Sequence, residues 1–277
     1  AAALDGSNKK GVWELLDIFR GAGGSPQSVV WVFGDRLPCM NTAQINATMA
    51  HASDYDDTHD PSPTHTGTSV LPAAFAIADM IGRVSGKRFL SAVVLGVELN
   101  IRLCLACRIT QFDSGWHFTS VHGCFSAAAV SGKLLGFDER MFLDSFGLAY
   151  HQASGNLQGM YEGSLAKRLG PGFAVRNGMM SSLLAQRGIG GAHEVLEGRY
   201  GLFNVYYGGA YSQDHLTRNL GSQYWIEDLS FKPYPCCRAA NAAIDAILAL
   251  RHENHLIAEE VDCIVVMVSD KFKQLLF

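Results

Sequence analysis

Helix-forming segments rich in small residues are the feature that most constrains the fold of this chain. Apolar side chains recur at the spacing of one helix face, whereas the alternation typical of strands is scarce. The pattern predicts long helices at residues 69–84, 87–109, 120–135, 139–156 and 172–187. Their many alanines, glycines and serines let helices pack closely around one another. The sequence therefore predicts a mainly α protein with a large all-helical domain.

Shorter elements are predicted on either side of these helices. Residues 13–19 favour an amphipathic helix that stops at the glycines of GAGG, and residues 28–33 favour a strand that ends at a Gly-Asp turn. An alanine-rich helix is expected to begin at Asn41 and to run into a cluster of histidines and aspartates. Residues 198–225, rich in glycine, tyrosine and asparagine, are expected to form an irregular loop at the mouth of a site.

The pattern changes near residue 229. A proline-punctuated loop, FKPYPCCRAA, leads into a helix, and the stretch VDCIVVMV from Val261 then alternates as a strand does. We therefore expect an all-helical domain at residues 1–228 and the beginning of a smaller α+β domain at residues 229–277. Because a single strand cannot bury itself, we expect this second domain to be incomplete within these residues.

The composition argues against several classes of partner. Lysine and arginine total 22 against 26 acidic residues, a net charge of −4 with no basic run, which argues against nucleic-acid binding. Glu98, Asn100 and Arg102 interrupt the apolar stretch 89–109, so we expect a buried helix and no membrane insertion. The seven cysteines show no disulfide framework, and the N-terminus lacks the layout of a signal peptide. Both features favour a cytoplasmic protein with reduced thiols.

Titratable residues gather in HASDYDDTHDPSPTHTG, which begins at His51. If the first half is helical, His51, Asp54 and Thr58 share one face, whereas Asp56 points elsewhere. The two prolines that follow exclude a helix, so a loop is expected to carry His65 back towards the helix end. A carboxylate, a hydroxyl and a histidine around one cavity suit proton transfer and carboxylate binding. The alternative is a polar helix end that caps the next helix.

A metal site is the main rival interpretation of this cluster. Asp56, Asp57 and Asp60 match the pattern DDxxD, with which helical prenyl-diphosphate enzymes hold Mg²⁺. Such enzymes need a second acidic or Asn/Ser/Glu cluster, which the sequence lacks, and the prolines after Asp60 disfavour the helix that carries the motif. We therefore do not expect a Mg²⁺–diphosphate site of this kind.

Three further motifs carry candidate residues. His117, in GWHFTSVHG, is expected at a helix N-terminus, where backbone N–H groups favour an anion. Lys167 and Arg168 precede an expected Gly-Pro-Gly loop and could clamp a carboxylate or, for the lysine, act as a base. Lys232 lies in the stiff KPYP loop. Each motif alone fits an ordinary structural role equally well or better: a capped helix start, a surface pair of cations and a turn.

Taken in order, MAHASDYDDTH, GWHFT, AKRLGPG and KPYPCCRA resemble the MmgE/PrpD family along nearly the whole chain. The family includes 2-methylcitrate dehydratases, cis-aconitate decarboxylases and iminodisuccinate epimerases. The resemblance implies a large helical domain and a smaller α+β lid, usually in a homodimer. It also implies an active site in the cleft between the domains, with no metal or organic cofactor.

The resemblance also assigns candidate residues. The catalytic ones are expected to be Asp54, Thr58, His65, His117 and Lys167. The resemblance also gives Lys232 as a site lysine, and we expect Arg168, Lys232, Cys237 and Asn241 to bind the substrate.

This sequence departs from the family pattern at three of its site positions. Many members carry histidine at the positions of Gly170 and Asn241, and the decarboxylase branch carries one near Cys237. The cysteine at position 237 argues against decarboxylation of cis-aconitate.

The sequence thus predicts an enzyme without a cofactor that abstracts a proton α to a carboxylate of a small di- or tricarboxylate, in a homodimer. A dehydratase is favoured, and an epimerase of the same family is the first alternative. The others are a Mg²⁺-dependent diphosphate lyase and a carboxylate-binding protein without catalytic activity.

Overall fold

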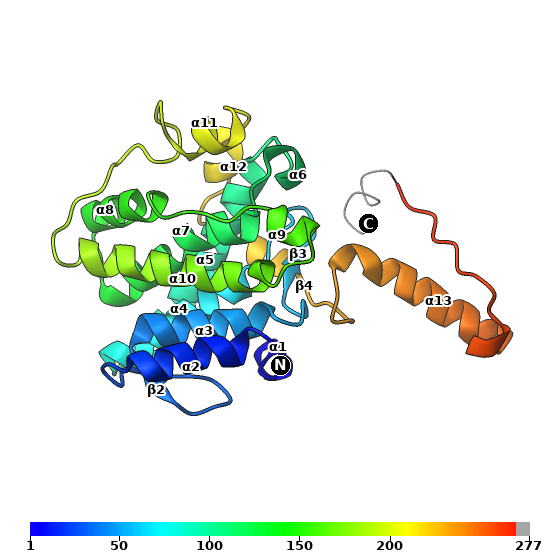
Figure 1. The fold of residues 1–277 in the computed structure, drawn as a ribbon. Helices are drawn as coiled ribbons and strands as arrows, with labels where there is room; N and C mark the ends of the chain where they lie inside the picture. Colours follow the sequence, from blue (N-terminus) through cyan, green and yellow to red (C-terminus); the bar gives the residue numbers. More distant parts are fainter. Residues whose placement is uncertain (270–277) are drawn as a thin grey trace.

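The computed structural model describes residues 1–269 and is mainly helical, as predicted (Figure 1). The longer helices are α2 (Val12–Ala22), α3 (Cys39–His51), α4 (Gly67–Ile81), α5 (Gly86–Ala106), α7 (Phe118–Leu135), α8 (Glu139–Tyr150), α10 (Ala166–Ala185) and α13 (Asn241–Asn254). The shorter helices are α1 (Ala2–Gly6), α6 (Gln111–Ser114), α9 (Gln158–Tyr161), α11 (Leu202–Tyr207) and α12 (Gln213–Thr217), with 3₁₀ turns η1 (Trp225–Asp228), η2 (Arg238–Ala240) and η3 (Ala258–Glu260).

Helix α7 lies at the centre of the body and packs against α10, α5, α4 and α8. Small residues make these contacts possible. A Cβ at Gly178 of α10 would overlap the carbonyl oxygen of Cys124 in α7, and a Cβ at Gly96 of α5 would overlap the side chain of Val130 in α7. The predicted close packing of glycine-rich and alanine-rich helices is therefore confirmed.

By length and composition, helix α5 is long and apolar enough to cross a membrane. However, 56% of its apolar 18-residue stretch is buried inside the protein. Its polar residues have partners within the fold. Arg102 forms a buried ion pair with Glu98, at 3.3 Å, and donates to the carbonyl oxygens of Leu216, Arg218 and Gln223. Glu98 accepts from the backbone N–H of Ile226. The polar residues that interrupt this apolar stretch thus fasten residues 216–226 to the body.

Some predicted boundaries are wrong. Helix α10 begins at Ala166, so the predicted Gly-Pro-Gly loop is helix and Lys167 and Arg168 lie in its first turn. This helix contains Pro171, and the next residue, Gly172, packs directly against Gln44 and Thr48 of α3. Contact between helices here outweighs the low helix propensity of the Gly-Pro-Gly sequence. Helix α8 ends at Tyr150, short of the predicted residue 156, and residues 198–225 contain α11 and α12 rather than only loop.

Strands are few and short in the described residues. β1 (Ser28–Val29) pairs with β2 (Arg36–Leu37), and β3 (Thr58–His59) pairs with β4 (Leu229–Ser230), both antiparallel. The predicted strand 28–33 stops after two residues because Val32 has a φ of 68° and Gly34 donates back to the carbonyl of Val30, which closes a turn.

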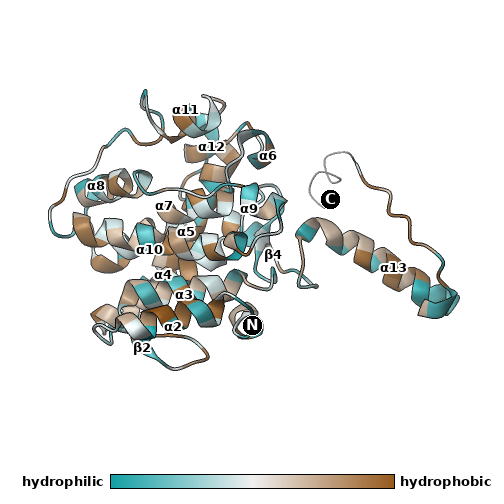
Figure 2. Cartoon of the chain, in the orientation of Figure 1, coloured by the Kyte–Doolittle hydropathy of each residue, from teal (hydrophilic) through white to brown (hydrophobic). Residues whose placement is uncertain are grey.

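Helix α13 projects away from the helical body (Figure 1). The extended segment after it, residues 261–269, is hydrophobic in composition (Figure 2) and has no ladder partner among the described residues. Met267 is 91% exposed. The strand predicted from Val261 is therefore not paired here. The division into domains at residues 1–228 and 229–277 stays a prediction.

Candidate functional site

The cluster HASDYDDTHD lies where α3 ends. The helix stops at His51, and Asp54 has a φ of 53°, a left-handed conformation that no helix continues through. Thr58 already belongs to β3. His51, Asp54 and Thr58 therefore do not share a helix face as predicted. The loop nevertheless brings all three to the wall of one cavity.

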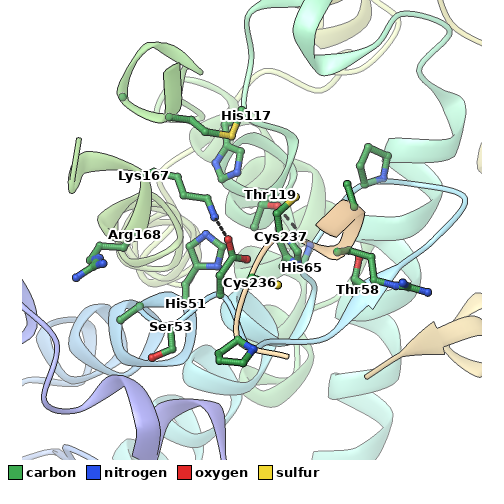
Figure 3. A pocket seen from close by; sticks show the side chains of 18 of the residues that line it. His51, Ser53, Thr58, His65, His117, Thr119, Lys167, Arg168, Cys236 and Cys237 are labelled. Atoms are coloured by element: carbon green, nitrogen blue, oxygen red, sulfur yellow. Dashed lines mark hydrogen bonds and ion pairs between the residues drawn. The ribbon is translucent and has the colours of Figure 1, made fainter. Parts of the chain in front are cut away.

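This cavity has a volume of about 890 Å³, within the range typical of small-molecule sites. It lies between the end of α3, the starts of α7 and α10, and the segment before α13 (Figure 3). The predicted site residues that line it are Asp54, Thr58, His65, His117, Lys167, Arg168 and Cys237. Lys232 and Asn241, predicted to bind substrate, do not line it.

Lys232 lies behind the cavity wall and holds two carboxylates together. Its buried Nζ donates to Asp54 Oδ1 at 2.6 Å, to the Asp54 carbonyl oxygen at 3.0 Å and to Asp56 Oδ1 at 3.2 Å. Burial alone would lower the pKa of Lys232, but the carboxylates of Asp56 and Asp54 outweigh it and raise the pKa. The ammonium group thus supports the site from behind, rather than facing a ligand.

Asp54 bridges two lysines, because its second oxygen accepts from Lys167 Nζ at 2.8 Å. Burial alone would raise the pKa of Asp54, but Lys167 and Lys232 outweigh it and hold the pKa well below its ordinary value. Asp54 therefore stays ionised and fixes the position of Lys167 in the cavity wall.

Asp56, predicted to point elsewhere, is a central residue of the site. Its Oδ2 lies 2.6 Å from His51 Nδ1 and 3.8 Å from His65 Nδ1. Burial alone would raise the pKa of Asp56, but His65, His51 and Lys232 outweigh it and lower the pKa. The prediction failed because it continued the helix through residues 52–57, where the chain forms a loop.

Three histidine rings meet at the floor of the cavity. The ring of His51 lies 5.4 Å from that of His65 and 6.2 Å from that of His117, between centroids. His65 Nδ1 donates to the carbonyl oxygen of Asp57 at 2.7 Å, which leaves Nε2 with the lone pair in the neutral ring. Burial lowers the pKa of His65 and, more strongly, that of His117. These shifts favour the neutral rings, which can accept a proton.

His117 is held at the N-terminus of α7, as predicted. Its Nδ1 lies 2.9 Å from Ser120 Oγ, and its backbone N–H donates to Gly155. Gly170 lies beside this pair, because a Cβ there would come within 2.5 Å of Ser120 Oγ and 3.8 Å of His117 Nδ1. A larger residue at position 170 therefore requires the hydroxyl of Ser120 to move.

Of the other predicted binding residues, Arg168 and Cys237 line the cavity, whereas Asn241 is buried behind its wall. Arg168 is partly restrained, because one guanidinium nitrogen donates to the carbonyl of Lys10 at 2.8 Å. Cys237 lines the cavity, and Asn241 behind it donates to Cys236 Sγ at 3.1 Å. Asn241 thus supports the cysteine loop instead of facing the cavity.

The aspartates of DDxxD do not converge. Asp56 faces His51 and Lys232, Asp57 accepts from Thr66 and the backbone N–H of Gly67 at the start of α4, and Asp60 pairs with Arg238. Asp57 is therefore a helix cap, the structural role weighed for this cluster. This geometry argues against the diphosphate-binding arrangement.

A different group of side chains satisfies the distances of a metal site. One ligand atom each from Asp54, Asp56 and His65 lie within 4.8 Å of one another. The ammonium group of Lys232 already bonds both carboxylates, however, and supplies the positive charge that a cation would bring. The donor set is therefore a poor fit for a metal ion.

Several polar atoms of the cavity wall lack partners. Buried atoms without a hydrogen bond among the described residues include His51 Nε2, Ser53 Oγ, His59 Nε2 and Gln111 Oε1, and all four residues line the cavity. Buried polar groups are normally paired with protein or ordered water, so these atoms are available to water or to a polar ligand. Sequence reasoning missed His51 and Asp56 as site residues, and their adjacency to Asp54 was the available signal.

Comparison with known proteins identifies the family of this chain. The model of the MmgE/PrpD N-terminal domain matches residues 1–214. A protein of Aspergillus terreus named cis-aconitate decarboxylase is 31% identical over 226 residues, which cover 78% of this chain and 46% of that protein. Mouse and human proteins of the same name are each 30% identical, over 84% of this chain and 48% of their own length. The chain thus spans about half the length of these curated relatives, and it belongs to the MmgE/PrpD family.

Proposed function

We propose that the protein is a lyase that transfers a proton at the carbon α to a carboxylate of a small polycarboxylate such as cis-aconitate. The observation that carries this proposal is the convergence of His65, His117 and Lys167 on one cavity, with Asp54 holding the lysine. The names of the relatives from Aspergillus terreus, mouse and human supply the substrate class.

The charges of the cavity suit this chemistry. Proton transfer at such a carbon places negative charge on the adjacent carboxylate as an enediolate, which fixed cations stabilise. Lys167 and Arg168 line the cavity and can bind the carboxylates, while Lys232 keeps Asp54 in place from behind. His65 and His117 have lowered pKa values, so their neutral imidazoles can accept the proton that dehydration removes. No step of this scheme needs a cofactor.

Decarboxylation and dehydration both use this proton transfer. In decarboxylation, the bond to a departing CO₂ breaks and a proton is added to the carbon α to another carboxylate. In dehydration, that carbon loses a proton and the neighbouring carbon loses its hydroxyl group. The names of the relatives favour decarboxylation. Cys237 favours dehydration as the second candidate, because a thiol lines the cavity where the decarboxylase branch carries a histidine.

Proton NMR in D₂O separates these reactions. The protein is incubated with cis-aconitate, citrate, 2-methylcitrate and iminodisuccinate, with and without EDTA. Release of CO₂ with deuterium at the α carbon identifies a decarboxylase, gain or loss of water a dehydratase, and inversion of configuration an epimerase. Activity is expected to persist with EDTA and to be lost in Lys167→Ala and His65→Ala, with the exposed Lys87→Ala as control. Absence of exchange with every substrate would contradict the proposal.

Two expectations from the sequence extend this proposal to the cell. The protein is proposed to form a homodimer, which sedimentation at several concentrations tests. It is proposed to act in the cytoplasm, which fractionation of the source cells tests.

A further inference from the structure

His51 is a histidine of the cavity wall to which neither the sequence nor the family motifs assigned a role. It is the last residue of α3 and is 1% exposed. Its Nδ1 lies 2.6 Å from Asp56 Oδ2, and its Nε2 is buried without a hydrogen-bond partner among the described residues. Figure 3 shows the ring close to Lys167 and the carboxylate that this lysine bonds.

The contact with Asp56 fixes how the ring of His51 can act. An ionised carboxylate only accepts hydrogen bonds, so Nδ1 of His51 carries a proton. In the neutral ring Nε2 then carries a lone pair, and in the charged ring it carries a second N–H. Either form lacks a partner in the described protein, and leaving a buried polar group unpaired is unfavourable. A ligand in the cavity is the available source of that partner.

The neighbouring groups of the cavity floor do not bond His51 Nε2 in the described structure. Both other rings of the cavity floor already use Nδ1, His65 with the carbonyl of Asp57 and His117 with Ser120. The ammonium group of Lys167 bonds Asp54. Among these three rings, His51 is the one whose Nδ1 is hydrogen-bonded to a carboxylate, and its Nε2 is left for a ligand.

We propose that His51 is a catalytic residue whose Nε2 contacts the bound polycarboxylate and exchanges the proton with its α carbon. This inference rests on the proposed function. In the decarboxylation direction, Nε2–H gives its proton to the α carbon as the bond to CO₂ breaks, and the nitrogen keeps the electron pair. Solvent then restores the proton. Asp56 holds the ring in place and stabilises the imidazolium before the transfer.

Imidazole ¹⁵N NMR of the wild-type protein tests this contact directly. Histidine is labelled, spectra are recorded with and without cis-aconitate, and His51→Gln, His65→Gln and His122→Gln assign the resonances. His122 is the matched control, a buried histidine that bonds Tyr207 and does not line the cavity. The ligand is expected to shift the Nε2 resonance of His51 and to leave that of His122 unchanged.

Turnover supplies a second readout. His51→Gln is expected to lower kcat by about 100-fold or more, the usual contribution of a general acid or base, with a smaller change in KM. His122→Gln is expected to keep most of the wild-type kcat, and thermal unfolding checks that both variants fold. If His51→Gln does not fold, sequence-specific assignment of the wild-type protein identifies the His51 resonance, and its response to cis-aconitate decides.

The outcomes separate this inference from the proposed function. If cis-aconitate shifts His65 but not His51, or if folded His51→Gln keeps near-normal kcat, the role of His51 is refuted and the proposed function stands. If neither cis-aconitate nor the other polycarboxylates shift any histidine of the cavity, both are refuted.

Discussion

Replacing Lys232 with methionine tests the buried charge cluster that supports the site. The substitution keeps an apolar stem of similar length and removes the ammonium group that bonds Asp54 and Asp56. Removing one partner of a buried ion pair costs about 3–5 kcal/mol. Asp54 keeps its ion pair with Lys167, and its side chain is 27% exposed. The energetic penalty therefore falls mainly on Asp56, whose side chain is 3% exposed, although Asp56 keeps its contact with His51.

Because these remaining contacts compensate in part, we expect the free energy of unfolding to fall by about 3 kcal/mol, the lower end of the range for a broken buried ion pair. For a chain of this size the melting temperature should fall by roughly 6–12 °C. Urea denaturation followed by circular dichroism at pH 7.5 measures the loss. Lys87→Met, at an exposed position, is the control and should change stability by less than about 0.5 kcal/mol.

The loss should also depend on pH. In the wild type, Asp54 and Asp56 have lowered pKa values, so their contribution is complete above pH about 5 and is lost as the pH falls through the folded-state values. Without Lys232 those values rise, and the deficit of the variant should shrink below pH about 5.

Local release of the segment around Lys232 could limit the measured loss. Trypsin cleavage after Arg238 should then become faster in Lys232→Met, because Lys232 helps to hold this segment on the body. If both the stability and the cleavage rate match those of the wild type, the buried charge cluster does not contribute as argued.

Three further predictions concern other parts of the chain. Gly178→Ala should lower the free energy of unfolding by about 1–3 kcal/mol in urea denaturation, because its Cβ would overlap the Cys124 carbonyl; an unchanged midpoint would contradict this contact. Burial lowers the pKa of His122 to about 3, so its contribution to stability is present above pH about 6.5 and declines as the pH falls. His122→Asn should therefore flatten the pH dependence of the melting temperature between pH about 6.5 and about 5. An unchanged slope would refute the lowered pKa of His122. Asp60→Asn should cost less than about 1 kcal/mol, since its pair with Arg238 is exposed, yet speed hydrogen exchange in residues 229–240; unaltered exchange would show that the pair does not hold this segment.

The helical body was predictable because its pattern is local. Helix-face spacing and small residues identify α4, α5, α7 and α10 without knowledge of their neighbours. The small residues also predict close packing, since no other side chain fits where α10 crosses α7 at Gly178. Helix ends were less predictable, and α10 begins before Gly-Pro-Gly because contact with α3 stabilises a turn that propensity disfavours.

The short strands and turns depend on distant partners. β3 exists because β4, far along the chain, pairs with it, and neither two-residue strand has a recognisable pattern of its own. The stretch 28–33 looked like a strand from its apolar residues, but its backbone turns at Val32. The alternating residues from Val261 show the converse, because a strand pattern without a partner leaves the segment exposed.

The sequence by itself determined the mainly helical fold and the residue types of the site, because helix periodicity and motif order are written along the chain. Only the tertiary structure decided which aspartate faces the histidines. Asp56 faces the cavity histidines and Asp57 faces the N-terminus of α4. The loop after α3 is fixed in this way by Lys232, 176 residues after Asp56, and by the backbone N–H of Gly67. Loop dihedrals have no period, so such long-range contacts set them, and the sequence pattern cannot.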